Sequence, residues 1–438
     1  MKKTNQVLFM ILILLGVLIK IKFLLLNNAL WWDASVYIGM AKSFVDTGGL
    51  WEPLRPLIWP LILASIMLFK VNTIFVAKII QLIFSLGSAY LVYVIGKRFF
   101  GINEAKIASL LLLFTPVITF YEGILLTEIP AVFFGLLTLY FFINEDYFLA
   151  GLSSGLSFLT KFPTGLLIIG LLIVTLGKNK QLFKVAGGFI IPLFFFLVSN
   201  YFWYGDLFLP LKDGMNVFAK SSWAYNEGLL FYLIGFFKEN VFFILGIIGL
   251  FCLKKKREHL LLILFFLLPF LYFGYITHKE VRFYILFLPF LCLLSAKGIT
   301  KLFEYKYLDL ILLVLLLIFI PVSYGKFVDY YNFKVETESY YNLVNELGIK
   351  GKILVSDPRF VLLTDKKLIP LYYENYDELK VMDKLKNANL VFINSCDMVC
   401  EPNTDCELVQ EKMQDYLEKN MTVYKTEQKK DCEFKVYI

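Results

Sequence analysis

Long apolar segments separated by short charged loops fill the first three quarters of this chain. The first segment covers residues 7–26 and is interrupted only by Lys20 and Lys22. Ten more follow, at 74–96, 105–121, 127–143, 147–160, 164–177, 183–204, 231–252, 259–276, 282–296 and 307–325. A perpendicular helix needs about 20 residues to cross a bilayer, so we expect the shorter segments to be tilted spans, half-helices or spans in locally thinned bilayer. The pattern predicts eleven membrane spans.

A cleaved signal peptide is the alternative interpretation of the first segment. Its length of roughly twenty residues and its lack of a small-residue cleavage site favour an uncleaved helix. Lys20 and Lys22 are then expected to extend toward the polar surface of the membrane.

Positive charge decides how the short apolar segment at 57–69 is interpreted, because cytoplasmic loops are enriched in Lys and Arg. If this segment does not cross the membrane, the inner loops hold 15 basic residues in 42 positions and the outer loops hold 8 in 85. If it does cross, every later loop changes side and the basic residues 254–257 lie outside. We therefore predict an interfacial or re-entrant helix at 57–69, a cytoplasmic N-terminus and a multi-pass protein of the cell membrane.

The chain changes character at residue 326, after which charged residues rise and apolar runs shorten to strand length. Residues 326–438 carry 16 basic and 20 acidic residues. Strand patterns occur at 352–356 and 388–394 and in the closing MTVYKTEQ and CEFKVYI segments, and helical spacing occurs at 340–348, 376–386 and 406–420. The predicted fold class is therefore mainly α: a polytopic helical membrane domain (1–325, with its first outer loop at 27–73) followed by a small extracytoplasmic α/β domain (326–438) that ends in a hairpin.

Four of the six cysteines lie in this outer domain: Cys396, Cys400, Cys406 and Cys432. An even number of cysteines outside the membrane predicts two disulfides, with three pairings left open. A four-cysteine zinc site is the alternative, although its usual Cys-x2-Cys spacing is missing. Reduced thiols are a third interpretation.

Composition agrees with a membrane protein. The chain is 58% hydrophobic with a mean hydropathy of +0.68, above the apolar share of ordinary globular domains. The net charge of +7 is distributed among short loops instead of forming one basic surface. This distribution excludes nucleic-acid binding.

The predicted topology brings several ionisable residues to the outer surface of the membrane. Asp33 lies among Trp31, Trp32 and Tyr37, and such aromatic residues favour the membrane interface. Arg55 opens the segment at 57–69, where a guanidinium can hold a phosphate through paired hydrogen bonds. The other outer residues are Glu128, Lys161, His278, Lys279 and Arg282. A plainer interpretation exists for each, as an acid near a helix N-terminus or a base reaching to headgroups.

The order of these residues resembles that of the GT-C superfamily of membrane glycosyltransferases, nearest to the protein O-mannosyltransferase and lipid A aminoarabinose transferase family. The matching stretches are Trp32-Asp33 with Tyr37, Arg55-Pro56, Leu126 to Pro130, Tyr204-Gly205-Asp206, and His278 through Tyr284 to Pro289. The family pattern has Asp-Glu where this chain has Asp33-Ala34, which weakens the prediction of a two-carboxylate metal site in this loop.

The resemblance implies transfer of a sugar, as in a mannosyltransferase, from a polyprenyl- or dolichyl-phosphate donor in the membrane lipid to a protein, lipid or glycan acceptor on the extracytoplasmic face. Such a transfer needs a carboxylate as base or metal ligand, and cations for the leaving phosphate. We predict that Asp33 and Glu128 fill the first role, with a divalent cation (Mg²⁺ or Mn²⁺) left open. The residues predicted to bind the donor phosphate are Arg55, Lys161, Lys279, Arg282 and Tyr284, and those of the substrate loop are Trp32, Tyr37, Tyr204 and His278.

Two other functional classes fit parts of the pattern. A transporter or flippase of lipid-linked saccharides would use the same charges as a translocation path, but transporters place such groups near the bilayer midplane and often contain inverted repeats. Neither feature is visible here. A scaffold whose outer domain binds a partner is the other alternative.

Overall fold

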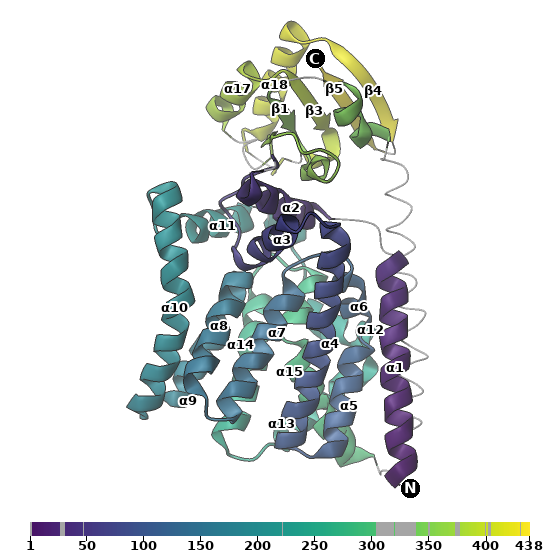
Figure 1. Cartoon of the computed structure of the whole chain (residues 1–438), viewed down its shortest axis with the longest axis vertical. Helices are drawn as coiled ribbons and strands as arrows, with labels where there is room; N and C mark the ends of the chain where they lie inside the picture. Colours follow the sequence, from purple (N-terminus) through teal and green to yellow (C-terminus); the bar gives the residue numbers. More distant parts are fainter. Residues whose placement is uncertain are drawn as a thin grey trace.

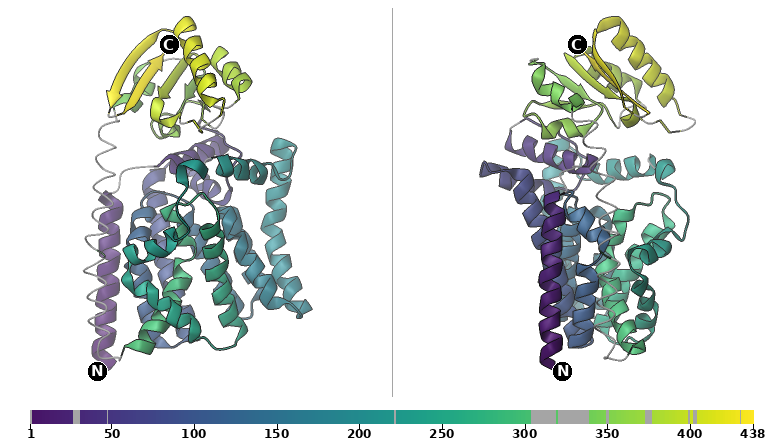
Figure 2. Two further views of the ribbon diagram at one scale, coloured as in Figure 1. Left: turned by 180° about the vertical axis from the view of Figure 1, so that it is seen from behind. Right: turned by 90° about the vertical axis from the view of Figure 1, so that its right-hand side faces the viewer.

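The protein is a bundle of helices with a small sheet domain over one end (Figure 1). The computed structural model describes residues 2–26, 31–46, 48–220, 222–303, 319, 339–348, 351–372, 377–398, 400–401, 404–429 and 431–438. Views from behind and from the side place the N-terminus at the end of the bundle away from the sheet domain (Figure 2). The predicted division at residue 325 and nearly all of the segment at 307–325 lie outside the described residues.

Among the described residues, four helices are long and apolar enough to cross a membrane. They are α1 (Lys2–Leu26), α4 (Thr73–Phe99), α10 (Asn179–Tyr204) and α14 (Arg257–Tyr275). Shorter apolar helices complete the bundle: α7 (Glu128–Ile143), α8 (Tyr147–Thr160), α9 (Leu166–Thr175), α12 (Phe231–Glu239), α13 (Gly246–Phe251) and α15 (Leu288–Leu302). These helices coincide with predicted apolar segments, and the chain is a multi-pass membrane protein. The count of eleven spans stays a prediction.

Three apolar segments predicted as single helices are broken. The segment at 105–121 becomes α5 (Ile102–Leu113) and α6 (Pro116–Glu122), bent by 53°, because Pro116 starts a new helix where its missing N–H is tolerated. The segment at 231–252 is interrupted at Asn240, whose side chain accepts a hydrogen bond from the amide of Phe242 and starts the 3-10 helix η3 (Val241–Leu245). The segment at 282–296 begins as the 3-10 helix η4 (Val281–Leu286) before α15.

Three amphipathic or short helices lie at the end of the bundle that faces the sheet domain (Figure 1). They are α2 (Trp32–Val45), α3 (Ile58–Leu68) and α11 (Leu209–Lys220). Helix α3 is the segment for which an interfacial position was predicted.

Small residues let neighbouring helices approach closely in the bundle. A Cβ at Gly151 of α8 would lie 2.0 Å from the carbonyl oxygen of Val185 in α10, and one at Gly188 of α10 would lie 2.1 Å from that of Phe148. Such contacts replace the hydrophobic effect, which does not drive helices together in lipid.

The described residues from 339 to 438, here called the C-terminal domain, contain a five-stranded sheet in the order β2-β1-β3-β5-β4. Strands β1 (Ile353–Val355), β2 (Leu368–Pro370) and β3 (Leu390–Asn394) are parallel, and β4 (Val423–Lys429) and β5 (Cys432–Tyr437) form the antiparallel hairpin at the end. Helices α17 (Glu378–Lys386) and α18 (Cys406–Asn420) match predicted helices. Strand β2 was not predicted, because only three residues pair and Pro370 ends it.

The four cysteines of the C-terminal domain form two disulfides, Cys396–Cys432 and Cys400–Cys406. The prediction of two disulfides is confirmed, and these pairs are one of the three open pairings. The alternatives of a zinc site and of reduced thiols are wrong, because all four sulfurs are used in the disulfides.

The prediction that Lys20 extends toward the membrane surface is wrong. Its side chain is 1% exposed and its Nζ lies 2.8 Å from Oε2 of Glu122, whose side chain is fully buried. Ser85 and Thr119 accept further hydrogen bonds from the same Nζ. Lys20 pairs with the charged Glu122 inside the bundle instead of extending to water at the membrane surface. Lys22, two residues later, is exposed.

We predict that Lys20→Met destabilises the folded protein by about 3–5 kcal/mol, because it leaves the buried Glu122 carboxylate without its partner. The double variant Lys20→Met with Glu122→Leu should recover most of this loss, since replacing both partners by apolar groups is often neutral. Unfolding in detergent micelles measures both. A single variant as stable as the wild type would contradict the assignment of a buried ion pair.

Candidate active site

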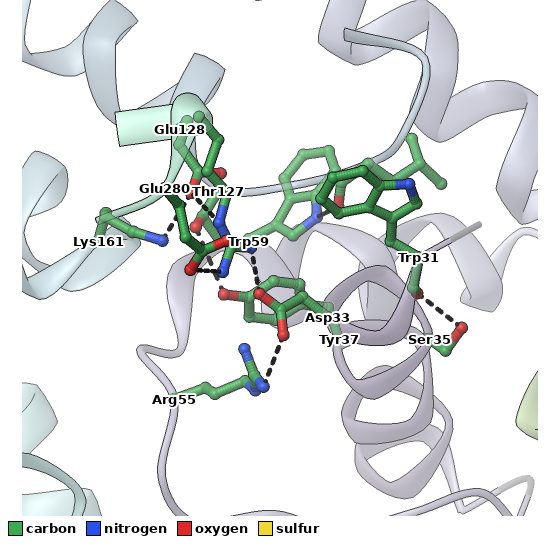
Figure 3. Close-up of polar contacts among 12 residues, drawn as sticks. Trp31, Asp33, Ser35, Tyr37, Arg55, Trp59, Thr127, Glu128, Lys161 and Glu280 are labelled. Carbon is green, nitrogen blue, oxygen red and sulfur yellow. Dashed lines mark hydrogen bonds and ion pairs between the residues drawn. The ribbon is translucent and has the colours of Figure 1, made fainter. Parts of the chain in front are cut away.

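Five segments that are distant in the sequence meet at the end of the bundle below the C-terminal domain. Asp33 lies in the first turn of α2, Arg55 in the loop before α3, Glu128 at the start of α7, Lys161 at the end of α8, and Arg282 in η4. Figure 3 shows the labelled side chains of Asp33, Arg55, Glu128, Lys161 and Glu280 directed toward a common centre. The sequence predicted that these charged residues lie on one side of the bundle, and in the structure they lie together at one end of it.

Two guanidinium groups hold the Asp33 carboxylate. Nη2 of Arg55 lies 2.8 Å from Oδ1 of Asp33, and Nη1 of Arg282 donates to Oδ2. The position of Asp33 in the first turn of α2 adds the favourable end of the helix dipole. Both oxygens of this carboxylate are therefore occupied by basic side chains.

Arg282 also links Asp33 to two further acids. Its Nη2 lies 2.7 Å from Oε1 of Glu280, and its Nε lies 3.6 Å from Oε1 of Glu128. The Arg282 side chain is 12% exposed and that of Glu128 is 1% exposed. One buried guanidinium thus contacts carboxylates from three segments.

Lys161 completes the pairing of Glu128. Its Nζ lies 2.6 Å from Oε1 of Glu128, which leaves Oε2 of Glu128 buried without a hydrogen-bond partner among the described residues. A buried carboxylate oxygen in this state is an available acceptor for a hydroxyl group.

Glu52 belongs to this cluster and was missed from the sequence. Its Oε1 accepts a hydrogen bond of 2.9 Å from Nε of Arg55, and its side chain is 4% exposed. The spacing of three residues between Glu52 and Arg55 was the available signal. Glu52 fixes the direction in which Arg55 presents its guanidinium.

The pKa values of the acids follow from burial opposed by ion pairing. Burial alone would raise the pKa of the Asp33 carboxyl, but Arg55 and Arg282 outweigh it and hold that pKa well below its usual range. Burial likewise opposes ionisation of Glu280, yet Arg282 and the hydrogen bond with His278 lower its pKa to about 2. Burial dominates at Glu52, whose pKa is raised. Asp33 is consequently an ionised but weak base while both arginines hold it.

Hydrogen bonds from neighbouring segments position the backbone around these acids. Leu125 has a positive φ of 64° in the turn before α7, and its carbonyl accepts a hydrogen bond of 2.9 Å from Nε1 of Trp59. Oη of Tyr37 lies 3.4 Å from Oγ1 of Thr127, and the guanidinium of Arg55 lies 5.3 Å from the centre of the Tyr37 ring. Tyr37 therefore contacts residues of the charged cluster, and its role in the substrate loop stays a prediction.

Two of the residues predicted to bind a phosphate lie apart from the charged cluster. Nζ of Lys279 donates to the carbonyl of Glu227, and its backbone amide donates to the carbonyl of Tyr225. Tyr284 is buried against α12, where its hydroxyl lies 3.5 Å from the carbonyl of Phe231. Both residues bind neighbouring segments of the chain in this arrangement.

The remaining predicted residues surround the cluster. His278 stacks on Tyr225 with ring centres 4.4 Å apart, and its Nε2 lies 2.9 Å from Glu280. Tyr204 lies beside Trp51, the neighbour of Glu52 in the sequence. Trp32 faces the C-terminal domain and contacts Tyr372, with ring centres 4.8 Å apart.

Comparisons with known proteins identify the fold. Residues 54–203 match the family model of dolichyl-phosphate-mannose-protein mannosyltransferases, and no curated protein has a matching sequence. The structure of ArnT from Cupriavidus metallidurans bound to undecaprenyl phosphate has 12% identity and a TM-score of 0.66, over 100% of this chain and 98% of ArnT. The chain has the GT-C fold.

A second solved structure with the GT-C fold extends the likeness to a more distant protein. It is the archaeal oligosaccharyltransferase AglB from Archaeoglobus fulgidus in complex with an inhibitory peptide and a dolichol-phosphate. It has 12% identity and a TM-score of 0.58, over 89% of this chain and 69% of AglB. The fold is therefore shared without close sequence similarity.

The arrangement of these side chains does not fit a divalent cation between Asp33 and Glu128. Arg55 and Arg282 occupy both oxygens of Asp33, and Lys161 and Arg282 approach the same oxygen of Glu128. Over the described part of the chain, no group of three or more His, Cys, Asp or Glu side chains could hold a metal ion. A requirement for Mg²⁺ or Mn²⁺ stays a prediction, and no step below depends on it.

We predict that Arg282→Met destabilises the protein by about 3 kcal/mol or more, because it leaves the partly buried acids Asp33 and Glu280, and the buried Glu128, without their shared partner. Unfolding in detergent, followed by tryptophan fluorescence, measures this loss. Lys212→Met is the control: it breaks the exposed pair with Asp206, and exposed pairs contribute little. Equal effects of the two variants would contradict the structural role of Arg282.

Proposed function

We propose that this chain is a membrane glycosyltransferase that moves a sugar from a polyprenyl- or dolichyl-phosphate donor to an acceptor on the extracytoplasmic face. The observation that carries the proposal is the Asp33 carboxylate held between Arg55 and Arg282 at the end of the bundle. These ion pairs would place the proposed base beside two cations that are suited to binding a phosphate. The GT-C fold, and the lipid phosphates named for the ArnT and AglB structures, support the same reaction class.

The transfer breaks one bond and forms another at the anomeric carbon of the sugar. The acceptor oxygen attacks this carbon, its proton passes to the carboxylate of Asp33, and the bond between the carbon and the phosphate oxygen breaks. The phosphate leaves with the electron pair. Arg55, Arg282 and Lys161 would stabilise its growing negative charge in a site that excludes most water. A single attack of this kind inverts the configuration of the anomeric carbon.

Binding of the donor would also activate the base. A phosphate accepts paired hydrogen bonds from guanidinium groups as a carboxylate does, so the donor competes with Asp33 for Arg55 and Arg282. Each hydrogen bond that an arginine transfers to the phosphate weakens the hold on Asp33 and raises its pKa. The acid then becomes a better base in the donor complex than in the free enzyme.

Glu128 would act beside Asp33 without carrying the main proton transfer. Its Oε2 has no hydrogen-bond partner among the described residues, and it can accept one from a hydroxyl of the sugar or acceptor. Lys161 binds its other oxygen, Oε1, at 2.6 Å.

The position of the charges supports an enzyme over the alternative of a transporter. The charged cluster lies at one end of the bundle, where α2, the start of α7 and the end of α8 meet. A translocation path would place its ionisable groups near the middle of the membrane.

We expect Asp33→Asn to lower sugar transfer by about 100-fold or more, because the amide cannot accept the proton of the attacking hydroxyl. The measurement is turnover in membranes supplied with a labelled lipid-phosphate sugar, at matched expression. Asp146→Asn is the matched control, since Asp146 is exposed at the start of α8, the end of that helix away from the site. Near wild-type turnover of Asp33→Asn would remove Asp33 from the mechanism.

We also expect kcat and kcat/KM to fall at different pH values on the acidic side of their pH profiles. Protonation of Asp33 removes the base, so each parameter falls as the pH drops through the relevant pKa. The free enzyme has the pKa of Asp33 held well below its usual range, so kcat/KM loses nothing through Asp33 near pH 4. In the donor complex this pKa rises toward its ordinary value, so kcat declines at a higher pH than kcat/KM. Donor binding measured at each pH separates lost affinity from lost turnover, and a kcat that stays constant to a lower pH than kcat/KM would contradict the exchange of arginines.

A further inference from the structure

The C-terminal domain contacts both ends of the segment that carries the charged acids and bases. Helix α2 begins with Asp33 in its first turn, and the chain returns through residues 48–57 with Glu52 and Arg55. In Figure 1 the domain lies directly above α2. The 3-10 helix η6 (Pro358–Leu362), which follows β1, packs against α2.

Lys42 makes the central polar contact of this interface. Its Nζ donates to the carbonyl oxygens of Val361 and Thr364 and to Oδ1 of Asp365, each at 2.8 Å. The Lys42 side chain is 13% exposed, whereas that of Asp365 is 83% exposed. The two backbone acceptors therefore define the contact, and the pairing with Asp365 adds little.

A backbone bridge fixes the segment after α2. Gly49 pairs with Lys367 in parallel register: the amide of Leu368 donates to the carbonyl of Gly49 at 3.0 Å. Gly48 has a φ of +88°, and a Cβ there would lie 1.8 Å from the carbonyl oxygen of Asp365. Only glycine permits the loop to approach the domain this closely. The bridge lies three residues before Glu52.

An aromatic contact fixes the other end of α2. The rings of Trp32 and Tyr372 meet edge to face with centres 4.8 Å apart. Such pairs contribute beyond the area they bury. Trp32 is the residue next to Asp33, so this contact lies beside the acid itself.

We propose that the C-terminal domain holds α2 and the loop after it in the position that active-site chemistry requires, with Lys42 as a positioning residue. The inference rests on the proposed function and gives this domain a role in it. Asp33 and Arg55 meet at 2.8 Å although 22 positions separate them. The segment from Trp32 to Arg55 contacts the domain at Trp32, Lys42 and Gly49. Displacement of a reacting group by about 1 Å can lower a rate by about 100-fold.

The test is Lys42→Met in the full-length protein, which keeps the length of the side chain and removes its three hydrogen bonds. We expect turnover to fall at least about tenfold and the KM for the lipid-phosphate sugar to change by less than turnover. Amide hydrogen exchange of residues 32–46 should become faster, because α2 loses its attachment. Lys42→Arg should recover most of the turnover, since a guanidinium can reach the same carbonyl oxygens. Asp365→Asn is the matched control and should stay within about twofold of wild type.

Several results would overturn the inference. Wild-type turnover of Lys42→Met would overturn it, whether or not amide hydrogen exchange in α2 becomes faster. A change in KM with unchanged turnover would also overturn it. If Lys42→Met does not fold, Tyr372→Ala tests the other end of the interface with the same assays, and unchanged turnover there has the same meaning. Failure of the wild-type protein to transfer any sugar from a lipid phosphate would instead reject the proposed function.

Discussion

The guanidinium of Arg282 is the group on which the arrangement of the site depends. It contacts Asp33, Glu280 and Glu128, and these acids come from segments that the chain brings together across 249 positions. Buried carboxylates are costly unless they are paired and hydrogen-bonded. The start of α2, the start of α7 and the loop before η4 are therefore held together by charge, and Lys161 and Arg55 extend the same network at its two sides.

This network has a consequence for the proposed chemistry, because the ion pairs that stabilise the site also hold Asp33, the proposed base. Asp33 is ionised but poorly basic while two arginines hold it. The same arginines are the groups best suited to a lipid phosphate. In the proposed mechanism, donor binding and activation of the base are one event. The C-terminal domain, by holding α2, would limit how far Asp33 moves when the arginines turn away from it.

Much of this organisation could be predicted from the sequence. The apolar segments predicted the helices of the bundle. The uneven distribution of basic residues among the loops predicted that Asp33, Arg55, Glu128, Lys161 and Arg282 lie on one side of it. The helix break at Thr115 was not predicted, since hydropathy is continuous across it. The break at Asn240 was not predicted either, because the polar residues Lys238, Glu239 and Asn240 were included in one apolar segment. The pairing of Lys20 with Glu122, and of Lys42 with the C-terminal domain, joins residues whose partners lie far away in the chain. No local pattern in a single sequence identifies such partners.

The most direct measurement is an experimental structure of the protein with a bound polyprenyl phosphate. The account predicts that Arg55 and Arg282 donate hydrogen bonds to the phosphate oxygens and that at least one of them no longer pairs with Asp33. A phosphate bound elsewhere, with both arginines still on the Asp33 carboxylate, would contradict it.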